Sequence, residues 1–189
     1  MSLFRVSLFV AVLAFLSGCG VQLSGSVANQ RNQIRSMEVE ALNKLYAQNP
    51  TARKQIQKSA GYAVFDASGG KVLFGGMDHG NGVAVDNKNG RRTYMKMFEL
   101  QPGIGLGYAN TRLIFVFESP SAFNDFVNSG WEFGGKASAA AKNDSGAGGG
   151  GDLGYNVAPG VNLYQMTEKG AMVGLSITGA KYWRNDDLN

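Results

Sequence analysis

The chain has 189 residues, of which 44% are hydrophobic and 17% are charged, and its net charge is +4. This length suits one ordinary domain with a hydrophobic core, and the composition excludes a chain that is disordered throughout. With 27 glycines and one cysteine, the chain favours a β-rich fold with close backbone contacts. It also excludes an intrachain disulfide and a zinc site built from cysteines.

The first 18 residues have the features of a bacterial lipoprotein signal peptide. Arg5 precedes an apolar run at 6–16, which is shorter than the ~20 residues that a membrane-spanning helix needs. The run ends in Leu-Ser-Gly-Cys at 16–19, which resembles a lipobox. The resemblance implies cleavage before Cys19, diacylation of its thiol and acylation of the new amine. We therefore expect residues 1–18 to be a signal peptide and Cys19 to be the lipidation site.

A lipidated Cys19 predicts where the mature protein is found. Acyl chains contribute ~0.8 kcal/mol per buried methylene, so three chains give stable anchoring. By resemblance to sorted lipoproteins, Gly20 in place of aspartate favours the outer membrane or cell surface of a bacterium. Residues 19–26 are small and polar and form the expected tether, and 27–189 form the expected domain.

Two helices are predicted after the tether. Apolar residues recur at helical spacing over 27–48, with Ser24 or Ser26 as N-cap. Asn49-Pro50 then suits an N-cap followed by the first helical position, which predicts a short second helix over 50–59.

From residue 61 the apolar period changes to two, which predicts strands. A turn is expected at 68–70, and Asn-Lys-Asn-Gly at 87–90 is a strong hairpin signal. Glycines alternate with large residues over 103–108, which lets another element approach closely. The run at 112–117 is apolar on both faces and predicts a central strand. The expected strands are 62–65, 71–74, 82–85, 92–100, 103–108 and 112–117.

The last third of the chain predicts one helix and more strands. Ser119-Pro120 begins a short helix that Gly130 ends. The segment 134–151 has little to bury and predicts a mobile surface loop or a small-residue strand. A final hairpin is expected between 157–166 and 171–182. The resulting class is α+β, with a strongly coiled or closed, barrel-like antiparallel sheet and N-terminal and flanking helices.

Positive charge concentrates in the predicted helices nearest the anchor. Residues 27–60 carry six basic and two acidic side chains, whereas 61–189 carry 11 basic and 12 acidic ones. Basic residues close to an anionic membrane contribute ~1 kcal/mol each. The alternative is an ordinary solvated helix face, in which Glu40 and Lys44 pair at i,i+4. The candidate lipid-binding residues are Arg31, Arg35, Lys44, Arg53, Lys54 and Lys58.

Catalytic and metal-binding constellations are weak in this sequence. His79 is the one histidine, and Asp78 beside it has no accompanying nucleophile. Asp186 and Asp187 lack the ligand number that calcium requires. The glycine run near 146–151 lacks the lysine and following serine or threonine of a phosphate-binding loop. We therefore expect no catalysis, no metal, no cofactor and no nucleic-acid partner.

Several ordered motifs resemble the SYLF domain family, over about residues 40 to 189. The individual motifs are short, but their order and spacing match the family's. They are KSAGYAVF at 58–65, KVLFGG at 71–76, GNGVAV at 80–85, GIGLG at 103–107, LIFVFE at 113–118 and YQMTEKGAMVGLSI at 164–177.

The resemblance implies a compact β-rich fold with flanking helices that binds acidic phospholipids through a basic N-terminal region. Phosphoinositides are the ligands in eukaryotic members, some of which also bind actin. Thr167-Glu168 stands where the family often has Ser-Arg, so a negative charge replaces a positive one there. An actin partner is expected only if the protein reaches a host cell. We therefore expect a membrane-anchored lipoprotein that binds acidic phospholipids, and the alternative is a structural or protein-interaction lipoprotein of the cell envelope.

Overall fold

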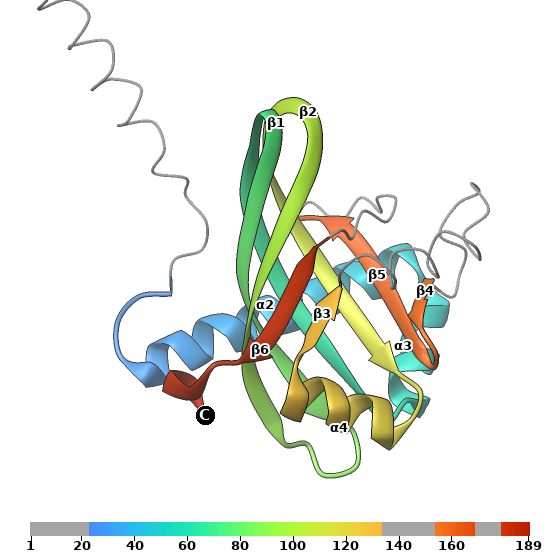
Figure 1. The fold of residues 1–189 in the computed structure, drawn as a ribbon. Coiled ribbons are helices and arrows are strands. Elements are labelled where there is room, and N and C mark those ends of the chain that lie inside the picture. Colours follow the sequence, from blue (N-terminus) through green and yellow to red (C-terminus); the bar gives the residue numbers. More distant parts are fainter. Residues whose placement is uncertain (1–22, 134–153, 169–178) are drawn as a thin grey trace, which may run out of the picture.

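The computed structural model describes residues 23–133, 154–168 and 179–189 (Figure 1). In this part of the chain, three α-helices and an antiparallel sheet curled into a half-barrel form an α+β fold, as the sequence predicts. None of the described helices combines the length and the apolar character that crossing a membrane would require.

The two N-terminal helices begin and end close to where the sequence predicts. Helix α2 spans Val27–Gln48, and the Ser26 side chain accepts from the Asn29 backbone N–H at its start. Helix α3 spans Pro50–Lys58, and the Asn49 side chain caps its first turn. Because Pro50 has no N–H to leave unpaired at the first helical position, it starts α3 without cost.

Strands β1 (Gly61–Asp86) and β2 (Arg92–Phe117) form one long antiparallel hairpin. Their pairing runs from Gly61↔Phe117 to Val85↔Arg92, with an irregularity between Leu73 and Gly75. The expected turn after Asp86 is present and joins the two strands. Both strands double back near their midpoints, so the hairpin forms a tall projection at the top of Figure 1.

The position at which β1 reverses differs from the prediction. The turn expected at 68–70 is wrong, because the chain stays extended there and reverses near Leu73, which has a positive φ of 56°. Gly69 instead allows close approach of the two arms of β1. A Cβ at Gly69 would lie 2.1 Å from the carbonyl oxygen of Met77.

The doubled β2 joins the rest of the sheet on both sides. Its first half pairs with β6 (Ala180–Arg184) and its second half pairs with β5 (Val161–Thr167). Strand β3 (Trp131–Phe133) pairs with β6, and β4 (Tyr155–Ala158) pairs with β5.

The hairpin expected between 157–166 and 171–182 is therefore wrong in its described parts. Strands β5 and β6 each pair with β2, because the two halves of β2 offer them separate partners. Within 157–166 the chain turns at Gly160 and forms the β4–β5 hairpin instead. Most of 171–182 and the whole of the predicted loop at 134–151 lie outside the described residues.

The sheet carries a hydrophobic core on each face. Helix α4 (Pro120–Ser129), which Ser119 caps and Gly130 ends as predicted, covers an aromatic core on one face. Helices α2 and α3 cover an aliphatic core on the other. The central strand predicted at 112–117 is confirmed, since Phe115 faces α4 and Ile114 faces α2 and α3, and both are fully buried.

Candidate functional site

A cleft of about 550 Å³ opens between the first half of α2, the start of β2 and the C-terminal residues. Its lining is strongly basic, and the described residues that line it include no aspartate or glutamate. Val127 and Asn128 at the end of α4 close one side. The arginines of this arginine cleft are Arg31, Arg35, Arg91, Arg92 and Arg184.

Three separate segments bring these arginines together. Arg31 and Arg35 are four residues apart and share one face of α2. Arg91 and Arg92 follow the turn that joins β1 to β2. Arg184 ends β6, and its partner in the ladder is Met95 of β2.

Arg31 is held in place at the cleft wall. Its Nε donates to the carbonyl oxygen of Leu188 at 2.9 Å, and its guanidinium lies 5.7 Å from the centre of the Tyr94 ring. Asn189 fixes that wall further by accepting from the Tyr94 N–H and donating to the Tyr94 carbonyl. A guanidinium stacked on an aromatic ring is positioned while its other N–H groups remain available.

Arg92 and Arg184 have carboxylate partners. Arg92 Nε lies 3.4 Å from Oε2 of Glu38, a buried residue that also accepts from the Tyr62 hydroxyl at 2.7 Å. Burial, and then the hydrogen bond to Glu38, raise the pKa of Tyr62 above its ordinary value. Arg184 Nε lies 3.4 Å from Oδ1 of the exposed Asp186.

Arg35 and Arg91 remain as uncompensated charges of the cleft. Both are exposed, and within the described segments neither forms an ion pair. The cleft therefore keeps a surplus of positive charge next to hydrogen-bonding asparagines. Planar guanidinium groups bind phosphate and carboxylate oxygens in bidentate geometry, so the arrangement suits an anion.

The six candidate residues from the sequence fall into separate places. Arg31 and Arg35 lie in the arginine cleft. Lys44 pairs with Glu40, as the solvated-face alternative proposes, and also donates to the Glu168 carbonyl. The other three residues lie on α3. The Arg53 guanidinium is 4.6 Å from the centre of the Tyr46 ring, and Lys54 and Lys58 are exposed.

Sequence reasoning missed Arg91, Arg92 and Arg184 as cleft residues. The adjacent arginines directly after a hairpin turn were a visible signal, because turn residues are exposed. Arg184 gave no such signal, since its position depends on the pairing of β6 with the distant start of β2.

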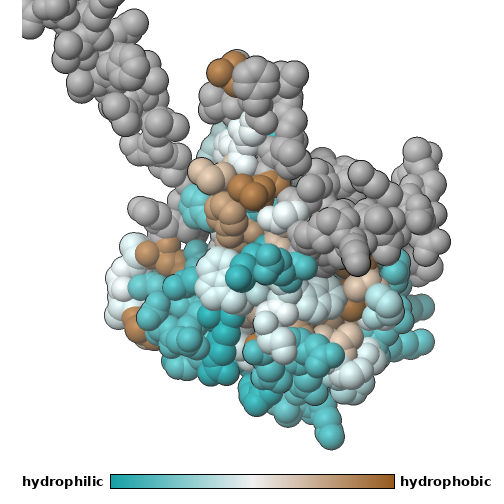
Figure 2. All heavy atoms as spheres, viewed as in Figure 1, coloured by the Kyte–Doolittle hydropathy of each residue, from teal (hydrophilic) through white to brown (hydrophobic). Residues whose placement is uncertain are grey.

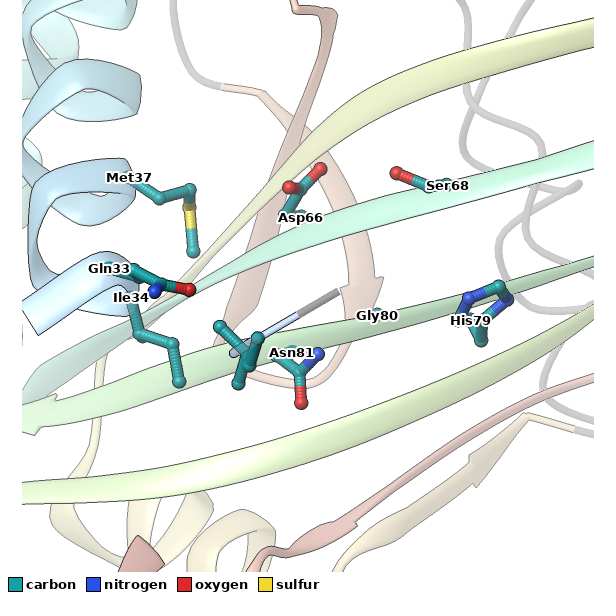
Figure 3. A pocket seen from close by; sticks show the side chains of 9 residues that line it. Gln33, Ile34, Met37, Asp66, Ser68, His79, Gly80 and Asn81 are labelled. Carbon is teal, nitrogen blue, oxygen red and sulfur yellow. The ribbon is translucent and has the colours of Figure 1, made fainter. Parts of the chain in front are cut away.

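A second, much smaller cavity lies under α2 (Figure 3). Asp66, Ser68 and His79 line its sheet side, and Ile34 and Met37 of α2 line the other. Asp66 pairs with the buried Arg112, but burial is the stronger influence and raises the pKa of the Asp66 carboxyl.

The small cavity does not form a catalytic or metal centre of a recognisable kind. Its volume of about 20 Å³ has room for roughly one water molecule. His79 is exposed at its edge. In the segments that the structure describes, no group of three or more histidine, cysteine, aspartate or glutamate side chains could hold a metal ion.

Glu168, which departs from the family pattern, has a structural place. One carboxylate oxygen accepts from Asn110 at 3.0 Å, and the other lies 3.8 Å from the Arg112 guanidinium. Its carbonyl oxygen accepts from Lys44 of α2. Glu168 thus joins the end of β5 to β2 and α2.

The fold and site together define an α+β domain with a surface arginine cleft at one end of a curled sheet. Residues 98–189 match the family profile described as "Ysc84: Las17-binding protein actin regulator". The chain is 34% identical over 158 residues to Beta cell expansion factor A of Aeromonas veronii, a match that covers 84% of this chain and 58% of that relative. Residues 98–189 are thus similar to the SYLF (Ysc84) family, which is lipid-binding or actin-regulating in type, and the chain spans a little over half the length of the relative that it matches.

Proposed function

We propose that this protein is a non-enzymatic, membrane-anchored lipoprotein that binds acidic phospholipids, with the headgroup phosphates held in the arginine cleft. The observation that carries the proposal is the convergence of five arginines from three segments on one cleft. Phosphoinositide-like headgroups, which carry several phosphates, match a site with more than one uncompensated guanidinium.

The proposed anchor would hold this end of the molecule against the membrane. From Cys19 to Ser26 the chain extends at most ~25 Å, at 3.3–3.6 Å per residue. The first half of α2, which begins directly after Ser26, supplies Arg31 and Arg35 to the cleft. Lipidation at Cys19 would therefore present the arginine cleft to the leaflet that holds the acyl chains.

The test compares two double variants with the same loss of charge, made in a Cys19→Ser chain that cannot be acylated. Arg35→Gln/Arg91→Gln changes the cleft without leaving a carboxylate unpaired. Lys54→Gln/Lys58→Gln changes exposed cations of α3. At ~1 kcal/mol per charge near the surface, the cleft variant should bind phosphatidylglycerol vesicles about ten- to thirtyfold more weakly.

The control variant should lose much less affinity, and added salt should weaken the wild type. Equal losses in both variants would show diffuse attraction to the whole basic surface and would refute a cleft-specific headgroup site. Unchanged binding of the cleft variant would also refute it. Far-UV circular dichroism establishes first that each variant is folded.

A second candidate is a protein-interaction lipoprotein of the cell envelope. The family description, which names a Las17-binding protein, favours it. A protein partner should co-purify from detergent extracts at high salt and should be unaffected by Arg35→Gln/Arg91→Gln. Vesicle binding that depends on salt and headgroup distinguishes the lipid-binding proposal.

A further inference from the structure

The doubled β1–β2 hairpin ends in an exposed apolar surface far from the arginine cleft. Figure 1 shows the hairpin rising above the rest of the molecule, and Figure 2 shows hydrophobic residues along this projection. The apolar tip is defined by four large side chains that are 58%, 60%, 49% and 50% exposed: Leu73, Met77, Leu100 and Tyr108.

Met77 and Leu100 share one face of the sheet, and Leu73 lies where β1 reverses. Met77 is the direct ladder partner of Leu100, and directly opposed residues lie on the same face of a sheet. Side chains alternate between the two faces of a strand, so Met77 and Val83, which are six residues apart in β1, lie on the same face. Val83 packs in the core under α2. The tip is thus the part of that face that extends beyond the helix.

Carboxylates are missing from the sequence that forms the tip. Residues 67–77 and 100–111 contain no aspartate or glutamate, and Lys71 is their one basic residue. The carboxylates that directly flank these segments, Asp66, Asp78 and Glu99, are 6%, 4% and 4% exposed. An approaching layer of lipid phosphates would therefore meet no carboxylate from these two segments.

The two strands stay paired with each other through most of the tip. Pairing between β1 and β2 continues through Val72↔Leu106 and Leu73↔Gly105 and resumes at Gly75↔Pro102. This pairing satisfies the backbone groups that face between the two strands, while β1 and residues 100–110 of β2 have no second strand partner in the described residues. Tyrosine and lysine are side chains that reach back to the headgroup level, while leucine and methionine are buried below it.

We infer that the apolar tip inserts into the acyl-chain region of a lipid bilayer. A convex projection without carboxylates has the shape and charge that suit a fluid, anionic layer. This inference goes beyond headgroup binding, because the tip lies at the opposite end of the hairpin from Arg91 and Arg92. It concerns a second lipid contact that does not depend on the cleft.

The first experiment places an environment-sensitive dye at the tip. Cys19→Ser removes the one cysteine of the chain, and Leu73→Cys or Asn89→Cys then accepts an NBD label. Asn89 lies in the exposed turn at the other end of the hairpin. With neutral phosphatidylcholine vesicles at high salt, the fluorescence emission of the NBD label at position 73 should shift to shorter wavelength. Lipids with brominated acyl chains should quench this emission. The label at position 89 should do neither.

The second experiment measures partitioning of unlabelled variants into the same neutral vesicles. Met77→Asp should reduce the partition coefficient about tenfold or more, because it places a carboxylate where the inserted tip would bury an apolar side chain in the bilayer. Val39→Asp is the matched control, since Val39 is 58% exposed on α2, away from the tip, and it should leave partitioning unchanged. Arg35→Gln/Arg91→Gln should also partition normally, so failure of the cleft proposal and failure of this inference are separable.

Three results would overturn the inference. One is an NBD signal at position 73 that is the same with and without vesicles. Another is a blue shift that depends on protein concentration in the absence of lipid, which would show that a second copy covers the tip. The third is equal partitioning of folded Met77→Asp and wild type.

Discussion

Glu38 shows how one buried carboxylate joins the helical layer to the sheet. It is 2% exposed and accepts from Tyr62 of β1, and it lies 3.4 Å from Arg92 of β2. Removing a buried charged side chain that has two partners is costly, because each partner is left without its hydrogen-bond acceptor or its opposite charge. Glu38 therefore stabilises the wall on which the arginine cleft is built.

Replacing Glu38 tests this directly. Glu38→Ala should lower the free energy of unfolding by about 1–3 kcal/mol, because the Tyr62 hydroxyl is left buried without its acceptor. Glu40→Ala removes an exposed carboxylate two residues away that pairs with Lys44. It should change the free energy of unfolding by at most a few tenths of a kcal/mol. Urea denaturation monitored by circular dichroism measures both, and equal effects would contradict the structural assignment of Glu38.

Tyrosine titration gives a prediction of pH dependence. Burial is the main cause that raises the pKa values of Tyr62 and Tyr182 above the ordinary value of 10.0. The unfolded chain therefore loses these protons at lower pH than the folded chain does. The stability that they contribute is fully present below pH 10 and is lost as the pH rises above it.

The tyrosinate absorbance band reports this behaviour. Tyr62 and Tyr182 should ionise only as the protein unfolds at alkaline pH. Tyr62→Phe should remove one of the late-ionising groups. Ionisation of all tyrosines in one step near their ordinary pKa, with the fold intact, would contradict the burial of Tyr62 and Tyr182.

At the scale of elements, the doubled β1–β2 hairpin depends on glycines at its close contacts. A Cβ at Gly69 would meet backbone and side-chain atoms of the other arm of β1 at 2.1 Å, whereas a Cβ at Gly107 would meet nothing within 4 Å. Two glycines of the same hairpin thus have opposite tolerance to substitution.

Gly69→Ala should therefore destabilise the protein by about 1–3 kcal/mol or more, because the arms of β1 must separate. Gly107→Ala should be neutral or slightly stabilising, since it restricts the unfolded chain without a clash. Thermal unfolding of the two variants measures the difference. Equal melting temperatures would show that β1 does not double back as described.

Local signals predicted most elements, and non-local pairing decided the rest. The caps at Ser26, Asn49 and Ser119 act within a few residues, and the helices begin where the sequence indicates. The reversal near Leu73 was not predictable in this way, since it depends on contacts between residues that are distant along β1. The same reason explains the final hairpin, because β5 and β6 pair with separate halves of β2.

The candidate site was predictable in part for the same physical reason. Arg31 and Arg35 lie on one helix face, which their spacing of four residues indicates without a structure. Arg91, Arg92 and Arg184 join them only after β2 has paired with β6. The positive charge of residues 27–60 thus indicated an anionic ligand, and the tertiary fold determines which basic side chains come together in the arginine cleft.

At the scale of the whole molecule, the proposed anchor determines which end faces the cell membrane. Cys19→Ser should abolish incorporation of labelled palmitate, since a hydroxyl cannot form the thioether. The unlipidated protein should then leave the membrane fraction on washing with high salt, whereas the wild type should stay. Palmitate labelling of the variant at the wild-type level would refute lipidation at Cys19.

The separation between the arginine cleft and the apolar tip has a mechanical consequence. About 13 residues of β1 separate Leu73 from the turn beside the cleft, which corresponds to roughly 40 Å at 3.3 Å per residue. A stiff spacer with a lipid contact at each end would cross-link two bilayers. Anionic vesicles should therefore cluster, with light scattering highest at an intermediate ratio of protein to lipid and lower in excess protein. Met77→Asp and Arg35→Gln/Arg91→Gln should each abolish clustering, because either one leaves the spacer with a single adhesive end.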